Sequence, residues 1–306
     1  PFDPAAVPPP SQPPLTVLGT QAFSENCSPC HGETGNSDGP VVANLTAPPP
    51  KFSDPATIWG KSPAEYFHTI KYGRIQNLMP PWGNRLSDDE IWLAAYYAWS
   101  LHTSEATVAQ GRTLYDANCA SCHGPQGKGD GAQAPLDLVD FSDSAAMIVR
   151  TQADLDAGWR KAHGDLGADW SAEDRLATLD AIRTFSYSPP WVTTVPPGEG
   201  VISGTVYQGT ADGDALTATT VALTGYINFS PAFTATTQSD ESGRFTFTQL
   251  SLVSGIQYVV DTVYKSLNYS SFTPPISVIT PTASVELAVY ETTDSADALH
   301  LQRASL

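Results

Sequence analysis

Two short signatures constrain this chain more than any other feature. They are Cys27-Ser-Pro-Cys30-His31 and Cys119-Ala-Ser-Cys122-His123, and together they use all four cysteines of the 306 residues. Each signature closes a longer repeat, in which a glycine, an aromatic residue and the first cysteine follow at intervals of four residues. That interval puts the three on one face of a helix. An internal repeat of this kind predicts two related domains.

The chemistry of the signature favours covalent haem. Two thiols one helical turn apart can add to the two vinyl groups of one haem, and the adjacent histidine then lies under the iron. A redox dithiol or half of a zinc site are the alternatives, but neither needs a histidine directly after the second cysteine. The sequence therefore predicts two covalently bound haem c groups. Their attachment residues are Cys27, Cys30, Cys119 and Cys122, and their proximal iron ligands are His31 and His123.

Residues 16–187 resemble two consecutive class I cytochrome c domains. The resemblance is carried by Gly19, Phe23 and Cys27 in the first copy and by Gly111, Tyr115 and Cys119 in the second. It implies that the last helix of each copy, expected at 87–101 and 171–185, crosses the first helix at the glycine. Tyr97 matches the aromatic residue that packs there in the family. Ala181 stands at the corresponding position of the second copy, which predicts a looser crossing.

The sixth ligand of each iron follows from the same resemblance. Met79 stands directly before a proline and resembles the family's Met-Pro ligand loop. The second copy has no Met-Pro, but His163 lies eight residues before its last helix, as Met79 does in the first copy. We therefore predict His163, with Met147 or an open or water-bound iron as alternatives; Met147 matches Ile58 and so a core position. Met ligation raises the potential of haem iron, so the two haems are predicted to differ in potential.

A proline near each proximal histidine is also implied by the resemblance. In the family, a proline carbonyl orients the imidazole, and such a bond fixes the ring. Pro135 stands at that place in the second copy, and Pro40 or Pro48 would serve in the first.

Changes of composition set the expected boundaries along the helical part. Residues 1–15 hold seven prolines, which predicts an extended leader that is either a tether or a disordered terminus. The first cytochrome-like domain is expected at 16–103 and the second at 104–187. A stiff proline-rich linker is expected at 188–199.

Beyond residue 199 the sequence is typical of an all-β domain. Period-two runs of Thr, Val and Tyr predict strands at 201–207, 219–223, 243–248, 258–264 and 285–290. Residues 200–293 resemble the Ig-like sandwich of carboxypeptidase-regulatory-like and transthyretin-like domains, and 294–306 form a tail. The expected fold class is therefore multidomain α plus β, with two all-α domains followed by an all-β sandwich.

Charge and hydropathy limit the partners and the compartment. A formal net charge of −17 excludes nucleic acid as a partner and favours basic or neutral redox proteins. The alternative is that the acidic surface only keeps the protein in solution. No run of about 18 apolar residues is present. The chain begins without Met or a signal peptide, which fits a processed, exported chain in the periplasm, at the cell surface or outside the cell. A lipid anchor or a membrane segment outside the given residues stays open.

Three functions are compatible with these features. The first is a dihaem cytochrome that carries electrons, alone or as a subunit of a larger membrane or cell-surface complex, and is not an enzyme. The second is a peroxidase-like enzyme, which would need a releasable ligand at one iron. The third is a structural subunit of a conductive cell-surface assembly, built by self-association of exposed edge strands.

Overall fold

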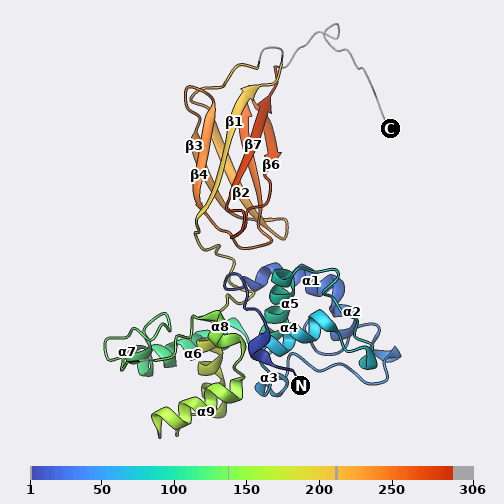
Figure 1. Cartoon of the computed structure of the whole chain (residues 1–306), viewed down its shortest axis with the longest axis vertical. Coiled ribbons are helices and arrows are strands. Elements are labelled where there is room, and N and C mark those ends of the chain that lie inside the picture. The colour runs from blue at the N-terminus through green and yellow to red at the C-terminus, as the bar shows by residue number, and fades with distance from the viewer. Residues whose placement is uncertain (1, 137, 211–212, 292–306) are drawn as a thin grey trace. The chain divides into compact units, whose positions relative to one another are not determined.

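The computed structural model describes residues 2–136, 138–210 and 213–291. They divide into two compact units, one made of Pro1–Thr193 with Val253–Gly255 and the other of Thr194–Leu252 with Ile256–Leu306. The first unit is helical and the second consists of strands (Figure 1), which confirms the α plus β class. Among the described residues, no helix is both long and apolar enough to cross a membrane. The predicted tail, 294–306, lies outside the described residues.

The first copy contains five helices. They are α1 (Gly19–Asn26), α2 (Ser28–His31), α3 (Pro55–Trp59), α4 (Pro63–Tyr72) and α5 (Asp88–Ser100). Helix α5 begins where the sequence predicts because Ser87 and Glu90 form a capping box, in which each side chain accepts a hydrogen bond from the other's backbone N–H. Asp88, Asp89 and Glu90 also place negative charge in the first turn, where the helix dipole favours it.

The second copy repeats this arrangement. Its helices are α6 (Glu105–Asn118), α7 (Ala120–His123), α8 (Ser144–Ile148), α9 (Gln152–His163) and α10 (Ala172–Arg183). Ser171 caps α10 by accepting a hydrogen bond from the backbone N–H of Asp174 at 3.0 Å. The predicted last helix of this copy is thereby confirmed.

The first and last helices of each copy touch at a glycine. A Cβ atom on Gly19 would lie 2.5 Å from the carbonyl oxygen of Leu93 on α5, and one on Gly111 would lie 1.8 Å from that of Ala177 on α10. Real Cβ atoms do not approach this closely, so only glycine lets the two backbones meet. The approach is closer in the second copy, not looser.

The aromatic contact beside the crossing comes from inside the last helix in the first copy and from just beyond its end in the second. In the first copy the rings of Phe23 and Tyr97 lie 5.0 Å apart. In the second copy Phe185, four residues beyond Ala181, brings its ring 4.9 Å from that of Tyr115. The prediction that Ala181 loosens this crossing is therefore wrong, because Phe185 supplies the missing aromatic packing.

The two copies share buried side chains within one unit. Ile148 at the end of α8 and Tyr187 after α10 belong to the same buried cluster as Phe67 and Trp99 of the first copy. The rings of Tyr187 and Tyr96 lie 4.8 Å apart. Burial of apolar surface shared in this way holds the copies together.

The proline-rich leader packs against the first copy. The indole N–H of Trp92 donates to the carbonyl of Pro8 at 3.2 Å, and the Ser11 hydroxyl donates to the Asp89 carboxylate at 3.0 Å. Residues 2–15 are therefore packed against the first copy, unlike the two alternatives predicted from the sequence, a free tether and a disordered terminus.

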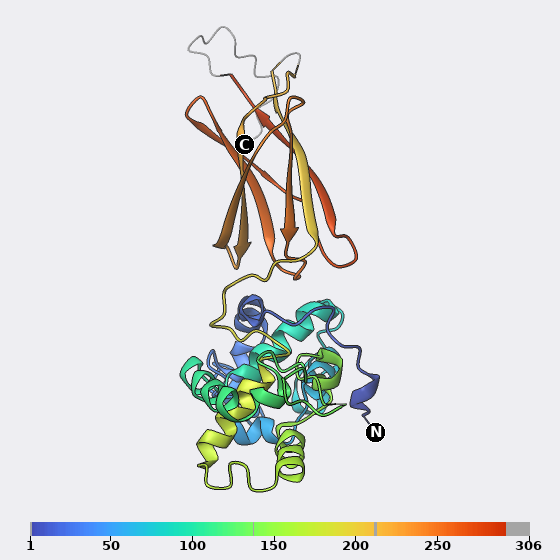
Figure 2. The same cartoon turned by 90° about the vertical axis from the view of Figure 1, so that its left-hand side faces the viewer.

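The described residues of the second unit form seven strands in two sheets. They are β1 (Gly200–Gln208), β2 (Thr220–Ile227), β3 (Ser230–Gln238), β4 (Arg244–Leu250), β5 (Gln257–Tyr264), β6 (Leu267–Phe272) and β7 (Thr282–Val289). The strand orders are β4-β1-β7, in which β1 and β7 are parallel, and β3-β2-β5-β6. Figure 2 shows the two sheets as separate layers.

Five of these strands were predicted, and β3 and β6 were not. Both are edge strands of the four-stranded sheet, and neither contains a buried residue. The alternation of buried and exposed side chains that identifies a strand in sequence is weak where no face is fully covered. The sequence therefore predicted all three strands of one sheet and the two central strands of the other, and missed the two edge strands that have no buried residue.

Candidate functional site

Each cysteine pair lies on a sharp turn between two helices. Cys27 ends α1 and begins the single turn of α2, and His31 donates its backbone N–H to the carbonyl of Cys27 at 2.9 Å. Cys119 and His123 repeat this bond at 2.9 Å at the end of α6. Glycine follows each histidine with φ of 78° and stops the turn. The turn thus holds both thiols and the imidazole together in each copy.

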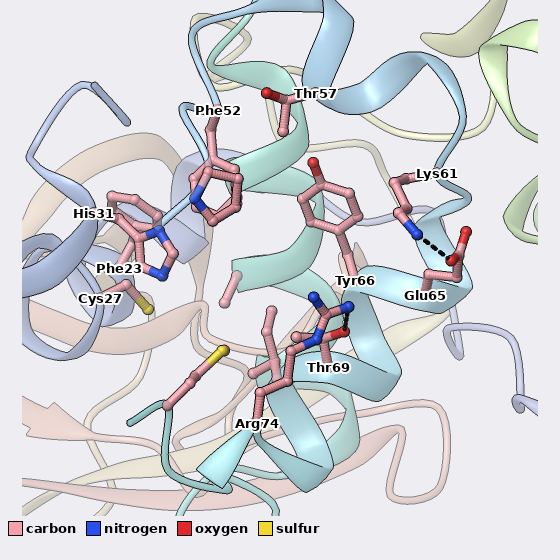
Figure 3. A pocket seen from close by; sticks show the side chains of 15 residues that line it. Phe23, Cys27, His31, Phe52, Thr57, Lys61, Glu65, Tyr66, Thr69 and Arg74 are labelled. Carbon is pink, nitrogen blue, oxygen red and sulfur yellow. Dashed lines mark hydrogen bonds and ion pairs between the residues drawn. The ribbon is translucent and has the colours of Figure 1, made fainter. Parts of the chain in front are cut away.

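The first signature opens onto an apolar cavity. Two adjacent cavities, of about 200 Å³ and about 170 Å³, share Cys27, His31, Pro50 and Met79 in their walls. Figure 3 shows Cys27 and His31 facing Tyr66 and Arg74 across the larger one. The structure thus brings the predicted attachment cysteines, the proximal histidine and the predicted sixth ligand of the first copy to one space.

A short, tightly held loop brings Met79 to this cavity. Met79 and Arg74 exchange backbone hydrogen bonds of 2.8 Å and 3.1 Å, after the 3₁₀ turn Ile75–Asn77. Gly73 has a φ of 71°, and a Cβ there would lie 2.6 Å from the nitrogen of Pro81 and 2.7 Å from the carbonyl oxygen of Met79. The loop geometry therefore depends on glycine at this position.

The His31 ring is held in its neutral form. Burial lowers the pKa of His31 to about 4, and the backbone carbonyl of Pro50 opposes part of this shift. Phe52 stacks on the ring, with 4.5 Å between centroids. Neutral imidazole is the form that binds metals. The proline beside this ring is Pro50, so the prediction of Pro40 or Pro48 is wrong.

The Nδ1 atoms of both proximal histidines lack a hydrogen bond of normal geometry. This holds for His31 and for His123 over the residues that the structure covers. The contact between Pro50 and His31 is therefore loose. The predicted bond from His123 to the Pro135 carbonyl is not made.

The second signature opens onto a cavity of about 300 Å³. Its walls include Cys119, His123 and His163 together with apolar side chains such as Leu155 and Ile182. The His123 and His163 rings lie 5.8 Å apart between centroids at 74°. Both imidazoles line the same cavity. Burial, and to a lesser extent the charge of His163, lower the pKa of His123.

Met79 and His163 reach their cavities from different backbones. Met79 lies in a loop, whereas His163 is the last residue of α9 and is exposed. The prediction of His163 rests on its separation of eight residues from the following helix, which equals that of Met79. Both side chains line a cavity, but their local backbone structures differ.

Met147, the alternative ligand, lies in the core. Its side chain is fully buried and packs with Tyr115, Phe141 and Ile182. It does not line the second cavity, whereas His163 does. Ile58, its counterpart in the first copy, is also fully buried. This placement supports His163 over Met147.

The thiols are poorly suited to the two competing chemistries. Burial raises the pKa of Cys27 to about 12 and that of Cys119 to about 11, and the neighbouring cysteine of each pair adds to the shift. Redox-active cysteine pairs need the opposite shift, toward thiolate at neutral pH. Within the described ranges, no three His, Cys, Asp or Glu side chains gather as a metal site. A dithiol oxidoreductase and a zinc site are therefore both disfavoured.

Comparison with protein families agrees with this geometry. Residues 16–97 match the model for cytochrome c oxidase, cbb3-type, subunit III, and residues 108–193 match the cytochrome c model. The chain carries two cytochrome c domains in tandem. We name residues 16–97 cytochrome domain 1 and residues 108–193 cytochrome domain 2.

Relatives match the cytochrome domains over part of their length. The cbb3-type cytochrome c oxidase subunit FixP of Sinorhizobium medicae is 32% identical over 133 residues, which cover 40% of this chain and 43% of FixP. FixP of Rhizobium etli is 32% identical over 185 residues, covering 56% and 59%. The chain thus spans about half the length of these relatives. The reducing HAO-like protein complex of Kuenenia stuttgartiensis aligns with 58% of this chain and 99% of its own at 19% identity, with a TM-score of only 0.25.

The two cysteine pairs, one in each cytochrome domain, match two covalently bound haem c groups. The cavities fit this cofactor because apolar walls surround a neutral imidazole next to the thiols. At the first cavity, Arg74 adds positive charge that suits the acidic edge of a haem, whereas Lys61 is paired with Glu65 at 3.0 Å. Bound haem supplies an iron that gains and loses one electron, while this chain provides the ligands and the surrounding charge.

Gly73→Ala is expected to displace Met79 in cytochrome domain 1. The new Cβ would meet the backbone of Met79 and Pro81 at a positive φ, costing about 1–3 kcal/mol. Chemical denaturation would measure this loss, and near-infrared magnetic circular dichroism would report loss of a Met-type band. Gly60→Ala is the control, since nothing lies within 4 Å of a Cβ there. An unchanged spectrum and stability for Gly73→Ala would contradict the role of this loop.

Proposed function

We propose that this chain is a dihaem c-type cytochrome that transfers electrons outside the cytoplasm, as a carrier or as the electron-transfer subunit of a larger complex. The supporting observation is that each cysteine-pair turn faces a cavity that also holds a second candidate ligand, Met79 or His163. An iron bound by two protein ligands has no open position for a substrate. Such a site exchanges electrons and does not catalyse a reaction at the metal.

We propose His31 and Met79 as the ligands of the first iron and His123 and His163 as those of the second. Methionine ligation raises the potential of haem iron relative to two histidines. Cytochrome domain 1 would then hold the higher-potential haem and accept electrons from cytochrome domain 2.

Relatives indicate the kind of partner. FixP proteins are subunits of cbb3-type cytochrome c oxidases. For this chain we propose redox protein partners within a membrane or cell-surface complex, and export, because haem attaches to such cysteine pairs after export. Domains are proposed at 16–103, 104–187 and 200–293, the last as an Ig-like module for docking or spacing.

The mass of the matured chain tests this proposal. The wild-type chain is expected to exceed its amino-acid mass by two haem groups. The paired variants Cys27→Ser/Cys30→Ser and Cys119→Ser/Cys122→Ser should each keep one, because each pair holds its haem independently. A colourless wild-type chain that weighs no more than its amino acids would refute the proposal.

A further inference from the structure

A fully buried arginine lies between the two cytochrome domains. The Arg183 guanidinium, on α10, donates to the carbonyl oxygens of Met147 at 2.7 Å and Arg150 at 2.9 Å. It also donates to the side-chain oxygen of Gln152 at 3.2 Å and stacks over Trp99 on α5 of the first copy, with Cζ 5.3 Å from the ring centroid. We name Trp99, His102, Gln152, Asp180 and Arg183 the interdomain seam.

The seam lies one side chain away from each haem cavity. On one side, the Trp99 ring is 5.4 Å from the ring of Tyr66, which lines the first cavity. On the other side, Ile182 and Arg150 line the second cavity, and Arg183 follows Ile182 directly and bonds the Arg150 carbonyl. Two rings, Trp99 and Tyr66, therefore separate the guanidinium from the first cavity. The wall residues Ile182 and Arg150 separate it from the second.

The charge of Arg183 is permanent. Burial lowers the pKa of its guanidinium, yet arginine stays protonated in proteins because its ordinary pKa is far above neutral. The phenols packed nearby add no compensating charge near pH 7. Burial raises the pKa of Tyr96 to about 12 and raises the pKa of Tyr187 further.

The pair of His102 and Asp180 beside it carries no net charge. Nδ1 of His102 lies 2.5 Å from the carbonyl oxygen of Trp99, which only accepts, so Nδ1 must carry a proton. Nε2 lies 3.0 Å from Oδ1 of Asp180, and one further proton must lie between them. Whether histidine or aspartate holds that proton, the two together sum to zero. An ionised Asp180 would stabilise the guanidinium nearby, but the net charge of the seam stays that of Arg183.

The remaining charged groups near the seam lie at the wall of the second cavity. Arg150 and Asp154 are opposite in sign and are at least partly open to water. Solvent screens such charges strongly, whereas a charge in the interior is screened far less. The charge that both cavities share is that of Arg183.

We propose that Arg183 is a potential-setting residue common to both haem sites, whose unbalanced positive charge raises both reduction potentials. This inference rests on the proposed function, because it needs a haem in each cavity. Reduction adds one electron to a site, and a positive charge held in a weakly screened interior stabilises that added negative charge. The same charge acts on both sites because it is fully buried between their walls.

Neutralising Arg183 tests the inference. In Arg183→Gln, spectroelectrochemical titration should give lower midpoint potentials for both haems. The expected change is roughly tenfold in the ratio of reduced to oxidised haem, which is 59 mV for a one-electron couple. Arg183→Met is a second neutral variant, with no unpaired polar group, in case the first fails to fold. Arg183→Lys keeps the charge and should stay near the wild-type potentials.

Two further variants separate charge from damage. Asp180→Asn disturbs an equally buried part of the seam but leaves its net charge unchanged, so both potentials should stay. Arg112→Gln removes a half-exposed arginine that stacks on Phe185 with Cζ 4.9 Å from the ring centroid. Both midpoint potentials should also stay unchanged in this variant. Equal shifts in Asp180→Asn and Arg183→Gln would overturn the inference, as would a shift of one haem only or of neither. Failure of the proposed function differs, because the wild-type chain would then lack haem.

Discussion

Gly111→Ala is expected to cost cytochrome domain 2 at least about 3 kcal/mol of unfolding free energy, the upper end for overpacked sites. The added Cβ would lie 1.8 Å from the carbonyl oxygen of Ala177, a backbone atom that no side-chain rotation can remove. Helices α6 and α10 would have to separate, and the packing of Tyr115 on Phe185 would open with them. Chemical denaturation followed by circular dichroism measures the loss.

Gly60→Ala is the control. Gly60 follows α3 with a φ of −103°, and nothing is within 4 Å of a Cβ built there. Alanine at an exposed position with such a backbone should stabilise by roughly 0.4–1 kcal/mol, because it reduces the conformational freedom of the unfolded chain. If the two variants changed stability alike, close backbone contact at Gly111 would not be what holds the crossing.

His163→Ala is expected to change the ligation of one iron completely. Removing the imidazole opens the position beside His123, so the reduced protein should bind carbon monoxide at one haem. Near-infrared magnetic circular dichroism should lose its bis-histidine band and keep the Met-type band of cytochrome domain 1. The physical reason is that the described walls of the second cavity bring no other histidine or methionine to it.

Met147→Leu is the control for this assignment. The buried thioether packs with Tyr115 and Phe141, so a side chain of similar volume should cost less than about 1.5 kcal/mol and leave the spectrum unchanged. Two Met-type bands in the wild-type protein, lost singly in Met147→Leu, would make Met147 the ligand instead. Carbon monoxide binding by the wild-type protein would favour the peroxidase-like alternative.

Local signals predicted the helices well. Ser87 and Ser171 stand at the starts of α5 and α10 as predicted, because a capping hydrogen bond joins residues only three positions apart. Strand β5 was equally clear, since its buried and exposed residues alternate. Strands β3 and β6 gave no such signal because neither contains a buried residue, whereas the edge strands β4 and β7 do.

Other contacts depend on how distant segments meet. Phe185 supplies the aromatic ring that is missing at position 181 of the second copy. Pro50 lies beside His31, where Pro40 or Pro48 was expected. The alignment of the two sequence copies could not predict either contact. The length of the loop between aligned positions decides which side chain lies beside the ring. Backbone geometry of the turns sets this, and the repeat in sequence does not encode it.

By itself, the sequence determined the attachment chemistry and the order of domains. Cys27, Cys30 and His31 lie within one helical turn, so their relation is settled by covalent spacing and local hydrogen bonds. The tertiary structure alone decided that His102 and Asp180, 78 residues apart, meet in a buried pair and leave Arg183 unbalanced between two cavities. Such a pairing arises only when two helices pack, because burial removes the water that would otherwise separate and screen these groups.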